Sequence, residues 1–238
     1  MARRRFFIDR IHNQQAELTG DDARHLARVL RAEPGQQYEI SDNQRAYLAE
    51  ILTASSRAIT FRILEPLPLP PPMPEITLYA ALIKFDRFEW LIEKATELGV
   101  MRIVPVNAER TEKGLAMAAA KRMERWRKIA RESGQQSRRL RMPEIDPVEL
   151  FANATANAAP SRFFLDEQPG PPLLLQSVQP APAYAVLTGP EGGWTDRERS
   201  HAVTSGWRPV SLGSNILRAE TAALAALAIL SQARPSGS

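Results

Sequence analysis

A run of prolines divides this chain into two parts that are expected to fold separately. Six prolines lie between positions 66 and 74, within the segment EPLPLPPPMPE (65–75). Proline has no backbone N–H to donate and fixes φ at about −65°, so this segment can form neither a helix nor a central strand. A stiff, extended connection is expected instead. We therefore predict an N-terminal domain at residues 1–70 and a C-terminal domain at residues 74–238.

The residues before the prolines have the pattern of short strands with one helix. The segment 21–30 (DDARHLARVL) is helical in pattern, and Leu26, Val29 and Leu30 fall on one face. Several short strands in so small a unit indicate a compact β-barrel. The strand-like segments are Arg4–Ile8, Gln37–Ser41, Arg45–Leu52 and Ala58–Leu64.

After the prolines, strands alternate with helices, which predicts an α/β domain with a largely parallel sheet. Trp90 and Trp126 lie among apolar residues at helical spacing and are expected in the core. Residues 151–160 and 167–182 are rich in Ala, Pro and Gln and are expected to be loops. The predicted strands are 76–83, 102–108, 161–166, 183–189 and 208–213, and the predicted helices are 87–99, 121–137, 195–206 and 219–233.

The composition excludes several kinds of chemistry. The chain of 238 residues has no cysteine, which rules out disulfides, a thiolate nucleophile and cysteine-ligated zinc. No apolar run reaches the roughly 18–20 residues that a membrane span needs, and no apolar segment follows the basic N-terminus as in a signal peptide. We expect a soluble cytoplasmic protein with neither a metal nor a membrane partner.

Positive charge is concentrated in two places. Nine basic and two acidic side chains lie between Lys121 and Arg141, and four arginines and one aspartate lie in residues 1–10, although the net charge of the chain is only +4. Localised positive charge attracts a phosphate backbone. A solvated helix face would have the same composition, so the basic runs alone leave both interpretations open.

Two loops near the C-terminus follow predicted strands and contain glycines. They are LTGPEGGW (187–194) and SLGSNILRAET (211–221). Ligands bind beyond the carboxyl ends of strands in parallel sheets, and glycines let the backbone approach a ligand closely. This suits an adenine read by main-chain groups between apolar walls. Neither loop has the GxxxxGK[ST] or GxGxxG pattern, and a tight connection between elements is the simpler alternative.

The two loops together resemble the signature of the SPOUT methyltransferases, and in detail that of the ribosomal RNA small subunit methyltransferase E family. Further similar segments are HLARVLR (25–31), KFDRFEWLIEKATELGV (84–100) and RESGQQSRRLRMPEI (131–145). The resemblance runs from about residue 5 to 232. It implies methylation of N3 of a uridine in 16S ribosomal RNA, with S-adenosyl-L-methionine as cofactor.

The resemblance also implies an architecture. An N-terminal PUA-like RNA-binding β-barrel (1–70) would precede a SPOUT α/β domain with a trefoil knot (74–238). The protein would be a homodimer that acts on small-subunit ribosomal RNA or the 30S subunit. The apolar face of the last helix is compatible with dimer packing, although burial within one subunit is the simpler alternative; its residues are Leu224, Leu227, Ile229 and Leu230. Where the family commonly has Glu-Gln-Ser, this chain has glutamine at 135, which cannot carry charge.

Three residues in these loops are candidates for catalysis. We expect Arg218 to stabilise negative charge that develops on the uracil carbonyls, and Glu220 or Glu191 to accept the N3 proton or orient the base. Alternatively, Glu220 is a first-turn carboxylate favoured by the helix dipole, and Arg218 a clamp for a phosphate or carboxylate. The predicted cofactor-binding residues are Leu187, Thr188, Gly189, Pro190, Glu191, Gly192, Gly193, Leu212, Gly213, Ile216, Leu217, Arg218, Thr221 and Ala222.

Contacts to RNA phosphates are expected from arginines and one lysine in both domains. His25 is expected to be a packed surface histidine, and Trp194 is a candidate for packing against the cofactor pocket. Two other functions stay open: methylation of a ribose 2′-hydroxyl in another RNA, and non-catalytic RNA binding in ribosome assembly. The predicted RNA-binding residues are Arg3, Arg4, Arg10, Arg28 and Arg31 in the first domain, and Lys84, Arg110, Arg138 and Arg139 in the second.

Overall fold

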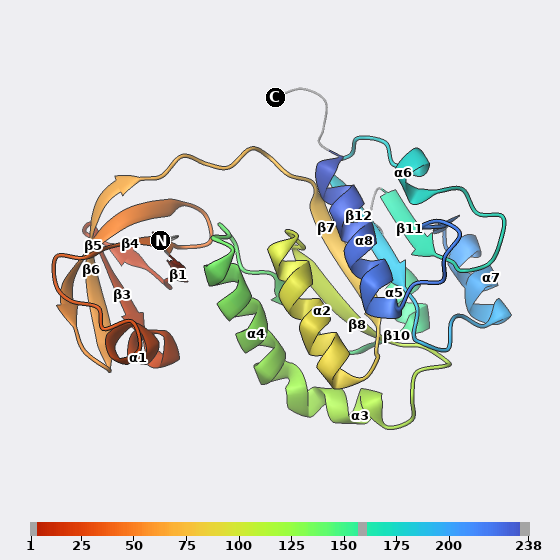
Figure 1. Cartoon of the computed structure of the whole chain (residues 1–238), viewed down its shortest axis with the longest axis horizontal. Helices are drawn as coiled ribbons and strands as arrows, with labels where there is room; N and C mark the ends of the chain where they lie inside the picture. Colours follow the sequence, from red (N-terminus) through yellow and green to blue (C-terminus); the bar gives the residue numbers. More distant parts are fainter. Residues whose placement is uncertain (1–3, 157–160, 234–238) are drawn as a thin grey trace. The chain divides into compact units, whose positions relative to one another are not determined.

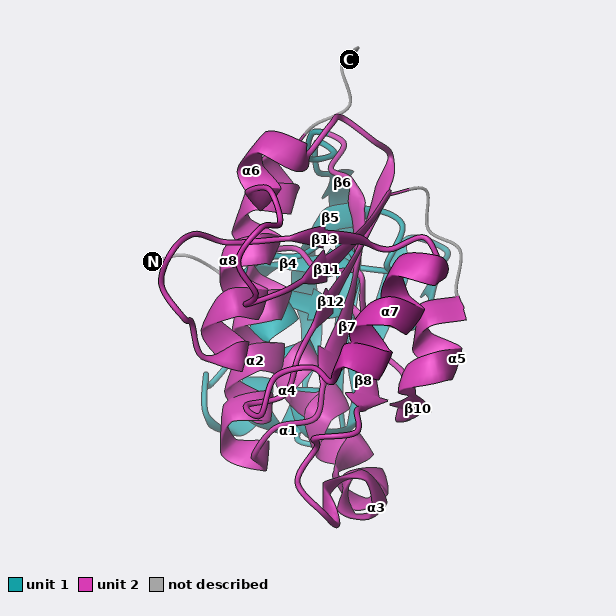
Figure 2. Ribbon diagram, turned by 90° about the vertical axis from the view of Figure 1, so that its right-hand side faces the viewer, with its two compact units in different colours: residues 1–71, 131–142 teal, residues 72–130, 143–238 magenta. Residues whose placement is uncertain are grey.

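The computed structural model describes residues 4–156 and 161–233, which form two compact units. Unit 1 comprises Met1–Pro71 and Arg131–Met142, and unit 2 comprises Pro72–Ala130 and Pro143–Ser238 (Figure 2). Unit 1 thus includes a segment, residues 131–142, that lies within the part of the chain predicted to form the C-terminal domain. Within the described ranges, no helix is both long and apolar enough to cross a membrane.

Unit 1 is a curled six-stranded sheet, a PUA-like half-barrel, with one helix, α1 (Gly20–Arg28) (Figure 1). Alternate residues of its strands are buried, as Ala16 and Leu18 are, because successive side chains of a strand point to opposite faces. The four predicted strands are confirmed, and the two short strands β2 and β3 were missed. The strands, in sheet order, are β1 (Arg5–Phe7), β4 (Gln37–Ser41), β5 (Ala46–Ala54), β6 (Ala58–Pro66), β3 (Gln15–Thr19) and β2 (Ile11–His12).

The apolar face predicted for the first helix is partly wrong. Leu26 is fully buried with Ala23, but Val29 is 65% exposed and Leu30 is also exposed. The helix ends at Arg28, and the backbone N–H groups of Val29 and Leu30 both close onto the carbonyl of His25. The Val29 N–H still makes the i→i−4 bond of an α-helix, so its side chain is exposed although it keeps the helical register. Leu30, whose N–H bonds five residues back, leaves that register.

The segment 131–142 is part of unit 1 through specific hydrogen bonds. Arg131 donates from Nε to Asp22 Oδ2 at 2.5 Å, and Ser41 Oγ donates to the Leu140 carbonyl at 2.6 Å. Ser41 is fully buried. Arg131 of the central basic run is therefore bound internally to the half-barrel.

Unit 2 contains a seven-stranded sheet whose described strand pairs are all parallel. This confirms the predicted α/β class with a parallel sheet. The trefoil knot that the resemblance implies stays a prediction. The strands, in sheet order, are β10 (Glu149–Leu150), β8 (Arg102–Asn107), β7 (Glu75–Ala81), β12 (Ala183–Thr188), β11 (Ser161–Leu165) and β13 (Arg208–Val210), with β9 (Glu144–Ile145) paired to β8.

Helices cover both faces of this sheet (Figure 2). Tyr184 and Val186 of β12 join the apolar cluster beneath α2 and α8, whereas Ala185 and Leu187 join the cluster beneath α5 and α7. The central strands are therefore apolar on both sides, as expected in a parallel sheet. The helices are α2 (Phe85–Glu97), α3 (Leu115–Ala119), α4 (Met123–Gln136), α5 (Phe151–Ala156), α6 (Leu174–Ser177), α7 (Asp196–Thr204) and α8 (Ala219–Gln232), with a 3₁₀ turn at Ala120–Arg122.

Several expectations for unit 2 need correction. The loop predicted at 151–160 begins with helix α5, and residues 157–160 lie outside the described ranges. The loop predicted at 167–182 contains the short helix α6. Trp126 is buried as predicted, whereas Trp90 is 45% exposed, because α2 buries Phe88, Leu91, Ile92 and Ala95 and Trp90 lies off that stripe.

Candidate functional site

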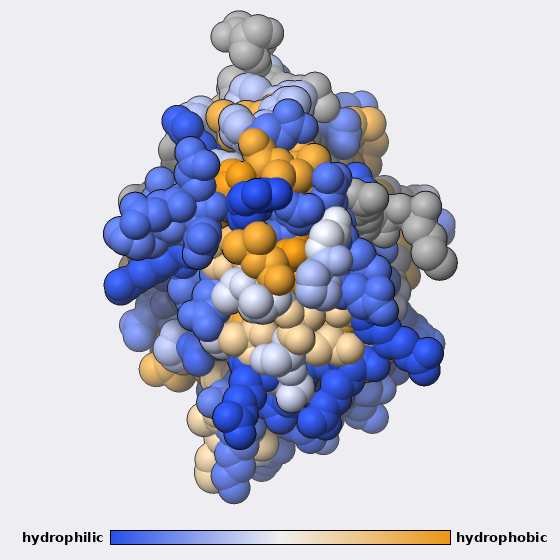
Figure 3. All heavy atoms as spheres, turned by 90° about the vertical axis from the view of Figure 1, so that its left-hand side faces the viewer, coloured by the Kyte–Doolittle hydropathy of each residue, from blue (hydrophilic) through white to orange (hydrophobic). Residues whose placement is uncertain are grey.

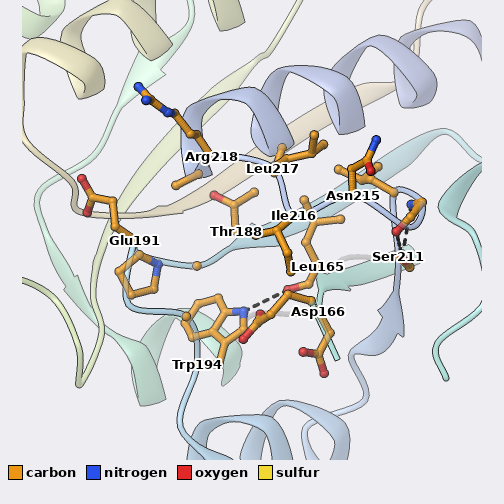
Figure 4. A pocket seen from close by; sticks show the side chains of 18 of the residues that line it. Leu165, Asp166, Thr188, Glu191, Trp194, Ser211, Asn215, Ile216, Leu217 and Arg218 are labelled. Atoms are coloured by element: carbon orange, nitrogen blue, oxygen red, sulfur yellow. Dashed lines mark hydrogen bonds between the residues drawn. The ribbon is translucent and has the colours of Figure 1, made fainter. Parts of the chain in front are cut away.

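Three loops meet at one edge of the unit 2 sheet. They follow β11, β12 and β13, which are neighbours in the parallel sheet, so that their carboxyl ends lie at the same edge. The loops line a cleft of about 530 Å³ (Figure 4), within the range that binds small molecules and cofactors. The two loops predicted from sequence are both present, and the third, at residues 165–167, was missed.

The first loop depends on two glycines. A Cβ on Gly189 would lie 3.0 Å from the ring of Trp194, and a Cβ on Gly193 would lie 2.6 Å from Glu167 Oε1. Gly193 also has φ +68°, in the left-handed region that favours glycine. Trp194 is buried and its indole Nε1 donates to the Leu165 carbonyl at 2.9 Å. The loop thus packs closely onto the third loop, with Trp194 in the wall of the cleft.

The first loop runs directly into α7, and a capping box fixes this junction. Thr195 Oγ1 accepts from the Glu198 backbone N–H at 3.2 Å, and Glu198 Oε2 accepts from the Thr195 N–H at 2.9 Å. Glu198 is buried, and its other oxygen accepts from the Glu109 N–H at 2.9 Å. The Thr-x-x-Glu spacing is a sequence signature of such a cap, so this feature was detectable in the sequence.

The second loop presents apolar side chains to the cleft. Ile216 is 78% exposed and Leu217 is also exposed, although both line the cleft. Figure 4 shows Ile216 in the middle of the pocket, with Glu191 and Arg218 toward one end and Ser211 and Asn215 toward the other. When a ligand covers an exposed aliphatic side chain inside a cleft, the burial of apolar surface favours binding. The flat face of an adenine ring fits this arrangement.

Charged groups flank the cleft. Glu191 Oε1 lies 3.6 Å from Arg87 Nη1, and both side chains are about one-third exposed. Arg218 is the N-cap residue of α8 and lines the cleft. Glu220 is buried and does not line the cleft, and its Oε2 has no hydrogen-bond partner among the described residues. Of the two candidate proton acceptors, Glu191 is therefore the one at the cleft.

Most of the predicted cofactor-binding residues line this cleft. Two of the fourteen do not: Leu187 is fully buried in the core beneath the loop, and Thr221 is exposed on α8. Sequence reasoning missed Asp166 and Glu167, although Asp166 ends a predicted strand and the same strand-end argument applies to it. The twelve that line the cleft are Thr188, Gly189, Pro190, Glu191, Gly192, Gly193, Leu212, Gly213, Ile216, Leu217, Arg218 and Ala222.

The RNA-binding residues predicted in the N-terminal domain are mostly at the surface. Arg10, Arg28 and Arg31 are exposed, and Arg4 Nη1 lies 3.3 Å from His25 Nε2. The face drawn in Figure 3 carries hydrophilic residues around a smaller apolar area. Arg3 lies outside the described residues.

Of the others, Lys84 is exposed, and Arg110 donates to the Gly192 carbonyl at 2.9 Å and so braces the first loop. Arg138 and Arg139 were predicted in the C-terminal domain but belong to unit 1, where Arg138 Nη1 lies 3.6 Å from Glu39 Oε1. Burial lowers the pKa of Arg139 to about 10, and its Nε donates to the Arg141 carbonyl. Their contribution to RNA binding stays a prediction.

Gln135, where the resembled family commonly has glutamate, is buried. Its Nε2 has no hydrogen-bond partner within the part of the chain that the structure describes. A neutral amide is far less costly to bury than an unpaired carboxylate. The uncharged side chain therefore suits this buried position.

The predicted dimer face is part of helix α8. Leu227 and Leu230 are buried in the core of unit 2, whereas Leu224 and Ile229 are only partly buried. Half of the predicted face is therefore used within the subunit.

Comparison with known proteins identifies relatives of both units. The RNA methyltransferase domain family matches residues 70–231, and the RNA methyltransferase PUA domain family matches residues 18–64. The chain is 36% identical to ribosomal RNA small subunit methyltransferase E of Synechocystis sp. over 89% of this chain and 71% of that protein. It is 29% identical to the protein of the same name from Bacillus subtilis, over 95% of each.

Solved structures give the same result. The crystal structure of a ribosomal RNA small subunit methyltransferase E from Neisseria gonorrhoeae bound to S-adenosyl methionine superposes with a TM-score of 0.87. The two chains are 30% identical, and the match covers 95% of this chain and 96% of that one. A Legionella pneumophila structure in complex with the same cofactor gives a TM-score of 0.86 at 28% identity, over 97% of each chain.

Proposed function

The chain belongs to the ribosomal RNA small subunit methyltransferase E family, and from this premise we propose that it transfers a methyl group from S-adenosylmethionine to N3 of a uridine in small-subunit ribosomal RNA. The observation that carries the proposal is the cleft formed by the GPEGG and LRAET loops, with Ile216 exposed inside it. A relative with this fold was crystallised with that cofactor.

The residues of the cleft fit an adenosyl group. Gly189 and Gly193 bring the backbone of the first loop close to the ligand space, and Ile216 and Leu217 supply an apolar surface. Backbone N–H and C=O groups can hydrogen-bond an adenine edge between such apolar walls. Leu212 adds a further apolar contact at the base of the second loop.

The chain's own residues must then position and deprotonate the base. The bound cofactor supplies an electrophilic methyl group on a sulfonium. Glu191 is placed at the cleft to accept the N3 proton or orient the base, and its pairing with Arg87 holds it at the rim. As N3 bonds to the methyl carbon, the carbon–sulfur bond breaks. Arg218 stabilises the negative charge that proton removal leaves on the uracil carbonyls.

The RNA is held by both units in this proposal. Exposed arginines of the PUA-like unit 1, including Arg10, Arg28 and Arg31, contact phosphates and position the RNA without reading its sequence. N3 takes part in base pairing, so the target uridine must be unpaired or extruded. We further propose that the protein works as a homodimer in the cytoplasm.

The test combines a cofactor titration with a methylation assay on small-subunit RNA. Wild-type protein should bind S-adenosylmethionine, and digestion and mass spectrometry of the product should place one methyl group on a uracil base. A methyl group on a ribose would instead indicate the 2′-hydroxyl alternative. Absence of cofactor binding would favour a non-catalytic RNA-binding protein.

The assignment of the proton acceptor has its own test. Glu191→Gln should slow methyl transfer far more than Glu220→Gln, because only Glu191 lines the cleft, and a positioned general base contributes roughly 10²–10⁴-fold. Comparable single-turnover rates for the two variants would refute the assignment.

A further inference from the structure

Arg199 of α7 makes contacts that join two of the loops around the cleft. Its Nε donates to Asp166 Oδ1 at 3.1 Å, and its Nη2 donates to Glu167 Oε1 at 2.6 Å. Its Nη1 donates to the Trp194 carbonyl at 2.8 Å and to Asp196 Oδ1 at 3.2 Å. Asp166, Glu167 and Trp194 all line the cleft, whereas Arg199 does not.

The contact between Arg199 and Asp166 is well shielded from water. The side chains of Arg199 and Asp166 are 16% and 8% exposed. Burial disfavours the charged guanidinium, but its hydrogen bond to Asp166 and the nearby carboxylates of Glu167 and Asp196 raise the pKa of Arg199 above its usual value. Hydrogen bonds between charged groups in such surroundings are stronger and better oriented than those at an open surface.

We propose that Arg199 is a positioning residue for cofactor binding: its guanidinium holds the 165–167 loop against the Trp194 end of the GPEGG loop, and so sets the shape of that wall of the cleft. The proposal rests on the function proposed above. Arg199 itself touches neither cofactor nor RNA in this account.

The surrounding geometry leaves the two loops dependent on this contact. Gly193 has no Cβ, which leaves room for Glu167 to reach Arg199. The Trp194 indole donates to the Leu165 carbonyl at 2.9 Å, which ties the same loops at a second point. Without the guanidinium, the Asp166 and Glu167 carboxylates would lose the cation that they share, and the 165–167 loop would lose its ion pairs to α7.

The planar, forked guanidinium is needed because four acceptors surround it. A lysine carries the same charge but presents it at a single point, so it cannot reach all four acceptors in one geometry. Arg199→Lys therefore keeps the positive charge but loses the contacts that position the loops, so it tests the two effects separately. Arg197 of the same helix is a matched control, because its side chain is 89% exposed and does not line the cleft.

The experiment compares wild type, Arg199→Ala, Arg199→Lys and Arg197→Ala in three measurements. These are the Kd for S-adenosylmethionine by calorimetry, KM and kcat at saturating RNA, and the melting temperature without ligand. Arg199→Ala should raise Kd and KM for the cofactor by about 10- to 100-fold, the loss of affinity or activity typical of metal sites when a residue that orients the ligand-contacting groups is removed. Its kcat at saturating cofactor should change less than its KM, and Arg197→Ala should match wild type.

Arg199→Lys should keep a cofactor Kd at least about threefold above wild type, because the fork is lost although the charge stays; this variant carries the test if Arg199→Ala does not fold. A fall in melting temperature with Kd and KM within twofold of wild type would overturn the proposal, since a purely structural role predicts that result. Full recovery of Kd in Arg199→Lys would overturn it too. Failure of the wild type to bind the cofactor would instead reject the proposed function.

Discussion

Gly193→Ala should destabilise unit 2 through two separable effects. The first is the backbone, since a residue with a Cβ at φ +68° loses about 1–2 kcal/mol relative to glycine. The second is steric, because the new Cβ would lie 2.6 Å from Glu167 Oε1 and displace it from Arg199.

The steric effect is worth about 0.5–1 kcal/mol, because Glu167 is 39% exposed and water screens its ion pair. The expected total for Gly193→Ala is therefore about 1.5–3 kcal/mol. Gly114→Ala is the matched control, because Gly114 lies in the same unit with φ +89° and nothing within 4 Å of its would-be Cβ. It should show the backbone effect alone, about 1–2 kcal/mol.

Urea unfolding followed by tryptophan fluorescence measures both variants, because all four tryptophans lie in unit 2. Gly193→Ala should also weaken cofactor binding, whereas Gly114→Ala should not. Equal destabilisation by the two substitutions would show that the close approach of Glu167 to residue 193 contributes nothing to the free energy of unfolding, and would refute this reasoning.

Three further variants test the cleft and the RNA surface. Arg218→Ala should lower kcat by roughly 10²–10³-fold and leave the cofactor Kd largely unchanged; unchanged single-turnover rates would remove it from the mechanism. Ile216→Ala should raise the cofactor Kd about tenfold or more and leave the melting temperature within a degree or two, because this side chain is already exposed in the free protein; calorimetry and thermal unfolding check both. Arg28→Gln combined with Arg31→Gln should weaken RNA binding and reduce the slope of log K against log salt by about one for each phosphate that the variant no longer neutralises, and an unchanged slope would place the RNA elsewhere.

Most elements of unit 2 could be predicted because buried strands and helices have recognisable patterns of apolar residues. Strands β7 and β12 are covered on both faces and appear as continuous apolar runs. The short helix α5 escaped prediction because its sequence, FANATA, contains Asn and Thr, which are weak helix formers.

The cleft was only partly predictable. Glycine-rich loops after strands indicated two of its sides. The third side depends on β11 lying between β12 and β13, and this strand order cannot be inferred from local sequence. Arg199 is one of several charged residues in TDRERS, and nothing local distinguishes it from Arg197. By contrast, the inward position of Glu220 follows from its spacing to Ala223 and Leu227 on the buried face of α8, and that pattern was available in the sequence.

The assignment of Arg131–Met142 to unit 1 has a consequence for synthesis of the chain. The half-barrel strands are complete once Pro66 has been made, yet Asp22 hydrogen-bonds to Arg131 and Ser41 to the Leu140 carbonyl. At about 5–20 residues per second, translation takes about 4–14 seconds to proceed from residue 71 to residue 142. During that interval the nascent half-barrel must leave the buried Ser41 hydroxyl and the Asp22 carboxylate without their final partners. The N-terminal unit therefore completes its folding only after more than half of the chain has emerged.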